Sequence, residues 1–286
     1  MFWGFDVEFM KGIRTKKLWA IVGVMLIFYV PVLYLMKQGN VTSDIDAIAI
    51  IINYVSGMAL FFLGILAIIF GSGAINKEIE DGTIRIALSK SVTRIGYFFG
   101  KFTAQGAVFL FALLLTSVVT LGGLAWIGIG IKKIFGDVLL LNVLLLLVML
   151  EFIAMGYIIS LFIRSSGTSL GVALAVFFII YLVIPAYVDY KVYSHEGLSS
   201  SELQKLHDDY YTKYLFFSPA AQLKVIMDKT VKEVNKSTEN GWETKYEYAG
   251  LSSAIRERSV NFALIIIMTL AYLGVATWRF LRMDLR

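Results

Sequence analysis

One acidic residue lies inside an otherwise apolar stretch and is the first candidate for chemistry. Glu151 is near the middle of the run 138–163, where an ionised carboxylate costs about 2.5–3.5 kcal/mol on membrane-insertion scales. Its side chain should therefore face protein or water and not lipid. Two interpretations stay open: Glu151 contacts a substrate or an ion, or it is a protonated carboxyl group that forms a hydrogen bond with a neighbouring helix.

Aromatic side chains in two other apolar stretches form a second candidate set: Phe61, Phe62, Phe177, Phe178 and Tyr181. They could line an apolar path through a membrane, and they could equally face lipid. The apolar stretches also contain amides, which are more often hydrogen bonds between helices than ligand sites. These amides are Asn53, Gln105, Asn142 and Asn261.

Several kinds of catalysis are excluded by residue types that the sequence lacks. Cysteine is absent, and both histidines, His195 and His207, lie outside the apolar stretches. These two facts exclude a thiol nucleophile, a disulfide framework and an intramembrane metalloprotease or Ser–His hydrolase. The stretch 71–77 is glycine-rich but lacks the spacing of a phosphate-binding loop, so close helix packing explains its small residues better. We expect no catalytic residue, no metal site and no cofactor on this chain.

Six apolar stretches must position the candidate residues. The 286-residue chain is 58% hydrophobic and 16% charged, whereas soluble domains are about 25% charged. Each stretch reaches the roughly 20 residues needed to cross a bilayer, and a helix satisfies its own backbone there. The sequence therefore predicts an all-α polytopic protein with transmembrane helices at 18–36, 47–74, 102–131, 138–163, 168–188 and 259–281.

The basic residues indicate an orientation. The net charge of +5 does not favour a nucleic-acid partner, because lysines and arginines lie at the ends of apolar stretches and form no continuous face. With the N-terminus in the cytoplasm, the short inside segments hold thirteen Lys and Arg and the short outside loops hold three. Positive charge is retained on the cytoplasmic side. We therefore expect a plasma-membrane protein with both termini in the cytoplasm.

Two accessory segments flank these helices. In 1–17, aromatic and aliphatic residues recur every three or four positions opposite charged ones, which favours an amphipathic helix in the membrane interface over a flexible basic tail. The extracytoplasmic segment 189–258 carries a Leu and Tyr stripe at helical spacing over 203–214 and a helix start at Ser218-Pro219. It predicts a small helical cap, with 238–241 as a loop and Val231 and Val234 continuing a helical face.

The cytoplasmic segment 75–101 is charged and longer than a simple turn. Its pattern predicts a helix, a tight turn at Gly82 and a second short helix. Such a segment could be a docking surface or a solvated connection. Its residues form the series Glu78-x-Glu80-x-Gly82-Thr83, Leu88-Ser89, Val92-Thr93-Arg94 and Gly100-Lys101-Phe102.

This series resembles the permease subunits of ATP-binding-cassette (ABC) transporters of the type-2 exporter class. It is most similar to the six-helix group that includes the permease serving nitrous-oxide-reductase maturation. Those proteins carry E-x-E-x-G-T…L-L-S-x-P-V-x-R…G-K at this place, and Ser91 stands here where they have proline. The layout of an N-terminal elbow helix, six spans, a long loop before the last span and an aromatic–Arg–x–Asp ending at 280–284 is also similar.

The resemblance implies a non-catalytic permease that works as a homodimer in lipid, with ATP and magnesium bound by a separate cassette ATPase. It implies a coupling helix at about 81–94 and a second contact near Arg164. The coupling residues would be Glu78, Glu80, Gly82, Thr83, Arg85, Ser89, Lys90, Arg94, Lys101 and Arg164. The expected function is export of an apolar or amphipathic substrate (a lipid, drug or peptide) or an ion. Two alternatives remain: mechanical transmission to an external partner without transport, and ion-driven secondary transport.

Overall fold

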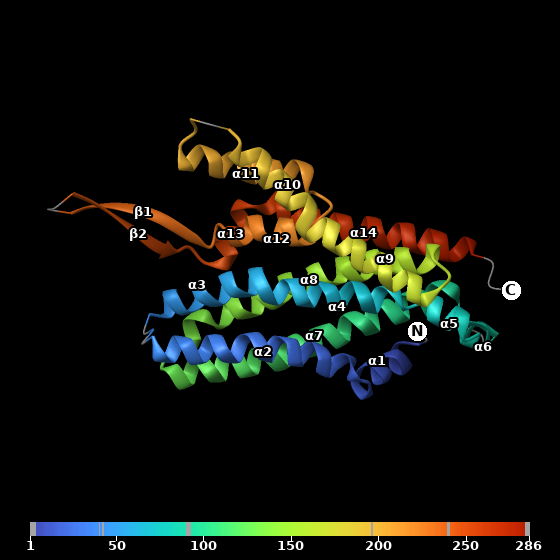
Figure 1. Cartoon of the computed structure of the whole chain (residues 1–286). Coiled ribbons are helices and arrows are strands. Elements are labelled where there is room, and N and C mark those ends of the chain that lie inside the picture. The colour runs from blue at the N-terminus through green and yellow to red at the C-terminus, as the bar shows by residue number, and fades with distance from the viewer. Residues whose placement is uncertain are drawn as a thin grey trace.

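The chain folds into a bundle of long helices that carries a smaller insert at one end (Figure 1). The computed structural model describes residues 4–39, 41, 43–89, 93–195, 197–238 and 241–283. The elements in chain order are α1 (Phe5–Arg14), α2 (Lys16–Gln38), α3 (Asp44–Tyr54), η1 (Val55–Ala59), α4 (Leu60–Ser72), α5 (Asn76–Glu80), α6 (Thr83–Ser89), α7 (Arg94–Ile127), α8 (Ile131–Phe162), α9 (Ser166–Phe178), η2 (Ile179–Val183), α10 (Ile184–Tyr193), α11 (Ser200–Tyr214), α12 (Pro219–Met227), β1 (Val231–Thr238), β2 (Gly241–Tyr248), α13 (Leu251–Glu257) and α14 (Ser259–Arg282).

Six helical stretches of the described chain are long and apolar enough to cross a membrane. They are α2, the run α3–η1–α4, α7, α8, the run α9–η2–α10, and α14, so the predicted all-α polytopic fold with six spans is confirmed. The third span begins earlier than predicted, at Arg94, because Thr93 caps it by accepting a hydrogen bond from the Gly96 N–H at 3.1 Å.

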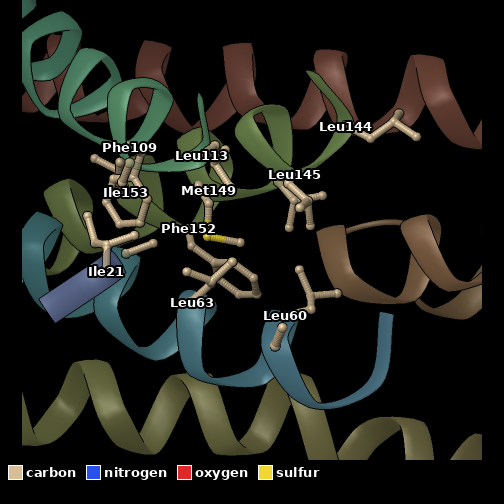
Figure 2. Packing of buried hydrophobic residues seen from close by; sticks show 14 of the residues in the cluster. Ile21, Leu60, Leu63, Phe109, Leu113, Leu144, Leu145, Met149, Phe152 and Ile153 are labelled. Atoms are coloured by element: carbon tan, nitrogen blue, oxygen red, sulfur yellow. The ribbon is translucent and has the colours of Figure 1, made fainter. Parts of the chain in front are cut away.

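Helix α8 lies at the centre of the bundle and is packed by α4, α7 and α14. Its inner face meets aliphatic and aromatic side chains of α2, α4 and α7 (Figure 2). Between membrane helices such packing stabilises mainly through van der Waals contact, because lipid is as apolar as the side chains. The contact is built from Leu144, Leu145, Met149, Phe152 and Ile153 of α8 with Ile21, Leu60, Leu63, Phe109 and Leu113.

Two glycines set the close approach of α4 and α8. A Cβ atom on Gly156 would lie 2.6 Å from the Ile68 carbonyl oxygen, and one on Gly71 would lie 2.4 Å from that of Ile153. Small residues allow helix backbones to approach in this way. The sequence pattern Gly156-x-x-x-Ser160 therefore acts within the chain. By contrast, a Cβ on Gly167 or Gly171 of α9 would meet no described atom within 4 Å.

Substituting Gly156 with alanine is expected to lower the melting temperature of the detergent-purified protein. The added methyl group forces α4 and α8 apart, and overpacking of this kind costs about 1–3 kcal/mol. Tryptophan fluorescence during heating measures the shift. The matched change Gly274→Ala in α14, where an added Cβ meets no described atom within 4 Å, should leave the melting temperature unchanged or raise it slightly, because alanine favours helix over glycine. Equal melting temperatures for the two variants would contradict this account of the contact.

The insert between α10 and α14 is only partly helical. Strands β1 and β2 form an antiparallel hairpin in which Val231 pairs with Tyr248 and Thr238 with Gly241. The prediction of a wholly helical cap is therefore wrong for this stretch, and Val231 and Val234 lie in β1 and continue no helix. The overlooked signal is the sequence 242–248, where aromatic or β-branched residues occupy every second position, a period that is typical of a strand.

The starts of the insert helices follow their caps. Helix α12 begins as predicted, with Ser218 accepting from the Ala221 N–H at 3.4 Å and Pro219 in the first turn. Helix α11 begins with a capping box, in which the Ser199 hydroxyl oxygen accepts from the Glu202 N–H at 3.4 Å and the Glu202 carboxylate accepts from the Ser199 N–H at 2.9 Å.

Candidate functional site

Within the segment 75–101, residues 76–89 form two short helices, α5 and α6, joined by a turn at one end of the bundle. Gly82 has φ +68° between α5 and α6, a left-handed conformation that glycine adopts without strain. The predicted helix–turn–helix is therefore confirmed. Figure 1 shows α5 and α6 on the same side as α1 and the last turns of α14. We call this side the α5–α6 end and the opposite side, with β1 and β2, the hairpin end.

Helix α5 is hydrogen-bonded to the junction between α8 and α9. The Ser160 hydroxyl oxygen accepts from the N–H groups of Ile75 at 3.1 Å and Asn76 at 3.0 Å, at the start of α5. Glu80, at the other end of α5, accepts from the Ser166 N–H at 2.8 Å. The backbone donors at both helix starts are thus satisfied by another segment. Displacing α5 must therefore displace the end of α8 and the start of α9.

A buried charged cluster joins α5 to α1 and α7. The Lys101 ammonium group on α7 binds the carboxylate of Glu78 on α5 and lies 3.4 Å from that of Glu8 on α1. The Tyr97 hydroxyl donates a second hydrogen bond to Glu78. We call Glu8, Glu78, Tyr97 and Lys101 the Lys101 cluster. Lys101 is 3% exposed, so it binds within the chain and presents no charge to a partner.

The Lys101 cluster favours the ionised form of the Glu8 carboxylate. Burial alone would raise the pKa of Glu8, but the ammonium groups of Lys101, Lys11 and Lys17 more than offset it and hold that pKa below its ordinary value. The Lys101 ammonium group thus compensates the charge of two carboxylates that come from different helices. Because each partner depends on the others for compensation, the cluster fixes the relative positions of α1, α5 and α7.

The remaining predicted coupling residues take two kinds of position. Arg94 donates to the carbonyl oxygens of Met283 at 3.0 Å and Leu281 at 3.4 Å, so the start of α7 is bound to the end of α14. Thr83, Arg85 and Arg164 are exposed at the surface of the α5–α6 end. The Ser89 side chain and all of Lys90 lie outside the described part of the chain.

Sequence reasoning missed Glu8, Tyr97 and Ser160. Ser160 carried a signal, because it follows Gly156 by one helical turn on the face that approaches α4. Glu8 carried none, since nothing local to an amphipathic helix shows that one of its acids will face a lysine in the third span. The tertiary structure alone brings Glu8 to Lys101.

The five candidate aromatic residues gather where α4 meets α9 and η2. The Phe61 ring centroid lies 5.6 Å from that of Phe177 and 5.2 Å from that of Tyr181. Phe177 is fully buried, whereas Phe62 and Phe178 are each 40% exposed on the surface of the bundle. The structure thus places the set in one cluster, with Phe62 and Phe178 on its outer side.

Three of the intramembrane amide side chains form hydrogen bonds to another helix. The predicted hydrogen bonds between helices are confirmed for Gln105, which donates to the Phe70 carbonyl at 3.3 Å, for Asn142, which donates to Ser117 at 2.5 Å, and for Asn261, which donates to Gln222 at 2.7 Å. Glu151 is 1% exposed, and neither of its carboxyl oxygens has a hydrogen-bond partner among the described residues. The interhelical hydrogen bond considered for Glu151 is therefore not formed in this structure.

Six apolar helices with a charged helix–turn–helix bonded to several of them define a polytopic membrane protein. A family model described as ABC-2 family transporter protein matches residues 5–285. The curated protein "Probable ABC transporter permease protein NosY" of Stutzerimonas stutzeri is 26% identical over 208 residues, which cover 68% of this chain and 72% of that protein. The chain belongs to the ABC-2 transporter family and is an ABC transporter permease subunit, as its resemblance to that class predicted.

Proposed function

We propose that this permease subunit docks a separate cassette ATPase through α5 and α6 and uses ATP hydrolysis there to export an apolar or amphipathic substrate. The observation that carries the proposal is the attachment of α5. Its Glu78 and Glu80 side chains and its N-terminal N–H groups bind α7, α9 and α8 respectively. A force applied to α5 and α6 therefore acts on three of the six spans at once.

The exposed residues of α6 fit the docking role, and the buried ones fit transmission. Arg85 is exposed on α6 and offers a cationic group for acidic residues of an ATPase. Lys101 and Ser160 bind α5 from α7 and α8, so a movement of the ATPase would act on them through α5. Coupling of this kind needs contacts that differ between two states of the bundle. ATP and magnesium belong to the ATPase in this scheme, and this chain supplies no catalytic residue.

A second copy of the chain completes the proposed transporter in the plasma membrane. One set of six spans carries one docking element, and a cassette ATPase pair needs two. The exposed apolar face of α9 supports this arrangement, because Gly167 and Gly171 leave room there for a neighbouring helix. In the proposed orientation, the α5–α6 end and both termini face the cytoplasm, and the distribution of basic residues supports this orientation.

Mechanical transmission without transport is kept as a second candidate because the insert is bonded to the last span. Asn261 at the start of α14 donates to Gln222 of α12 at 2.7 Å and to Thr212 of α11 at 2.8 Å. Arg94 contacts the other end of the same helix. A shift of α14 would therefore move the insert and anything bound to it. The ion-driven alternative is set aside, because ABC transporters draw on ATP.

Co-purification with the cognate cassette ATPase tests the proposal. The double variant Gly82→Pro with Arg85→Glu should lose at least nine-tenths of the bound ATPase, because proline cannot adopt the positive φ of Gly82 and the charge on α6 is reversed. Lys132→Glu makes the same charge reversal on an exposed residue at the hairpin end and should retain the ATPase. Equal retention by the double variant would place docking elsewhere, and no association with the native chain would refute the proposal.

A further inference from the structure

An open pocket of about 530 Å³ lies at the hairpin end, where the second and fifth spans meet the insert. One wall is apolar and comes from η2 and α10, with Leu182, Pro185 and Ala186. The opposite wall comes from α11 and α12, through Tyr211 and Ala221. A volume of this size holds a drug-sized molecule. The pocket is separate from the docking element, which lies at the other end of the bundle (Figure 1).

Both π-helical turns of the chain as described border this pocket. Gly57 lies in η1 and Tyr181 in η2, and the Tyr181 hydroxyl donates to the Gly57 carbonyl oxygen at 3.1 Å. Wide turns of this kind occur often at functional sites. Tyr181 also belongs to the cluster with Phe61 and Phe177. The floor of the pocket is therefore continuous with the aromatic residues between α4 and α9.

The polar side of the pocket has an excess of negative charge. Asp189 and Asp228 contribute carboxylates, and Lys224 contributes one ammonium group. Lys224 is directed toward Tyr211, with its nitrogen 3.5 Å from the phenol oxygen and 4.9 Å from the ring centroid. Among the residues that line the pocket, two carboxylates therefore accompany one ammonium group.

One carboxylate oxygen in this wall lacks a donor. Asp189 Oδ1 is buried and accepts no hydrogen bond within the described chain, although His207 Nε2 lies 3.3 Å from it. A buried acceptor without a donor is unfavourable, and a ligand N–H would remove that cost. A ligand that suits this pocket would therefore carry a hydrogen-bond donor next to an apolar group.

We propose that this pocket binds an amphipathic amine, with its ammonium group on Asp189 and Asp228 and its apolar body against Leu182, Pro185 and Ala186. The view that this amine is the exported substrate rests on the proposed function. The proposal that the pocket binds an amine does not rest on that function, because no residue of α5 or α6 lines the pocket. Anionic amphiphiles are disfavoured by the two carboxylates, and strongly polar amines by the apolar wall.

Fluorescence anisotropy of rhodamine 6G, a cationic amphipathic dye, tests the pocket on the full chain in nanodiscs of zwitterionic lipid, with empty nanodiscs as the blank. The native chain should bind the dye, and Asp189→Asn with Asp228→Asn should weaken binding at least tenfold. Ala186→Trp should also abolish binding, because it fills the pocket without removing a charge. The matched control, Asp209→Asn with Glu257→Gln, removes two carboxylates from the other side of α11 and should bind as the native chain does.

Three results would overturn the proposal: native binding no greater than the blank, equal binding by the native and Asp189→Asn/Asp228→Asn chains, or equal binding of the anionic dye carboxyfluorescein. Melting temperatures within a few degrees of native show that a variant is folded, and Ala186→Trp provides an independent test if the double variant is not. The assay contains no ATPase. Dye binding without ATPase association would keep the pocket and refute the proposed function, and the reverse would refute the pocket alone.

Discussion

Replacing Lys101 with methionine is expected to destabilise the protein strongly and to abolish stimulation of the partner ATPase. The change leaves the buried Glu8 and the half-buried Glu78 without the ammonium group that they share. Removing one member of a buried ion pair costs about 3–5 kcal/mol. Helix α5 would also lose its bond to α7, which the proposed transmission requires. Thermal unfolding measures the first effect, and ATPase rates in proteoliposomes measure the second.

Two comparisons make the Lys101 result specific. Lys132→Met removes an exposed lysine at the hairpin end and should change neither quantity. Adding Glu8→Gln and Glu78→Gln to Lys101→Met removes the uncompensated carboxylates, so part of the lost stability should return while ATPase stimulation stays low. Non-additivity of this kind is the signature of directly interacting groups. A Lys101→Met chain with native melting temperature and native stimulation would rule out the cluster as a structural and transmitting element.

Replacing Asp208 with asparagine is expected to loosen the insert from α14. Asp208 is 1% exposed, binds the Arg258 guanidinium group and lies 2.8 Å from the Lys229 ammonium nitrogen. The neutral amide leaves these two cations without their anion, at a cost of about 3 kcal/mol. Limited proteolysis should then cut the insert faster. Asp209→Asn changes the exposed neighbour and serves as the control; equal cleavage of the two variants would contradict the role of Asp208.

The stability difference between the native protein and the Asp208→Asn variant is also expected to depend on pH. Burial alone would raise the pKa of Asp208, but His207, Lys229 and Arg258 more than offset it and hold that pKa below its ordinary value. A carboxyl group with a lowered folded-state pKa stabilises the fold above its unfolded pKa and loses that contribution as the pH falls through the folded value. The difference in stability between native and Asp208→Asn should therefore be full near neutral pH and shrink below about pH 4.

The local part of the coupling segment could be predicted from the sequence, and its connections could not. Gly82 between two short charged runs indicated the turn, since few other residues suit that backbone conformation. Lys101, at the edge of an apolar stretch, is indistinguishable in sequence from a lysine at the membrane surface. Its burial depends on Glu8 and Glu78, which reach it only when three elements meet.

The hairpin and the aromatic cluster also show that a local sequence pattern does not report how segments pack in the folded chain. The period of two over 242–248 is a local signal for a strand, but it stands in a segment whose earlier parts follow a helical period. The five aromatic residues singled out from the sequence lie in one cluster, and a path along them stays a prediction. Which of them point outward depends on the packing of α8 against Phe177, and sequence periodicity does not report that.

The link between Glu8 and Lys101 also imposes an order on biosynthesis. Helix α1 leaves the ribosome before α7, and its buried carboxylate contacts its main cation only after α7 has been made, ninety-three residues later. At roughly 5–20 residues per second this interval lasts about 5–20 s. During that time Glu8 has only neighbours such as Lys11, 3.8 Å away in the finished protein. We therefore expect α1 to stay at the membrane surface and to take its final position only after the third span, α7, has been inserted.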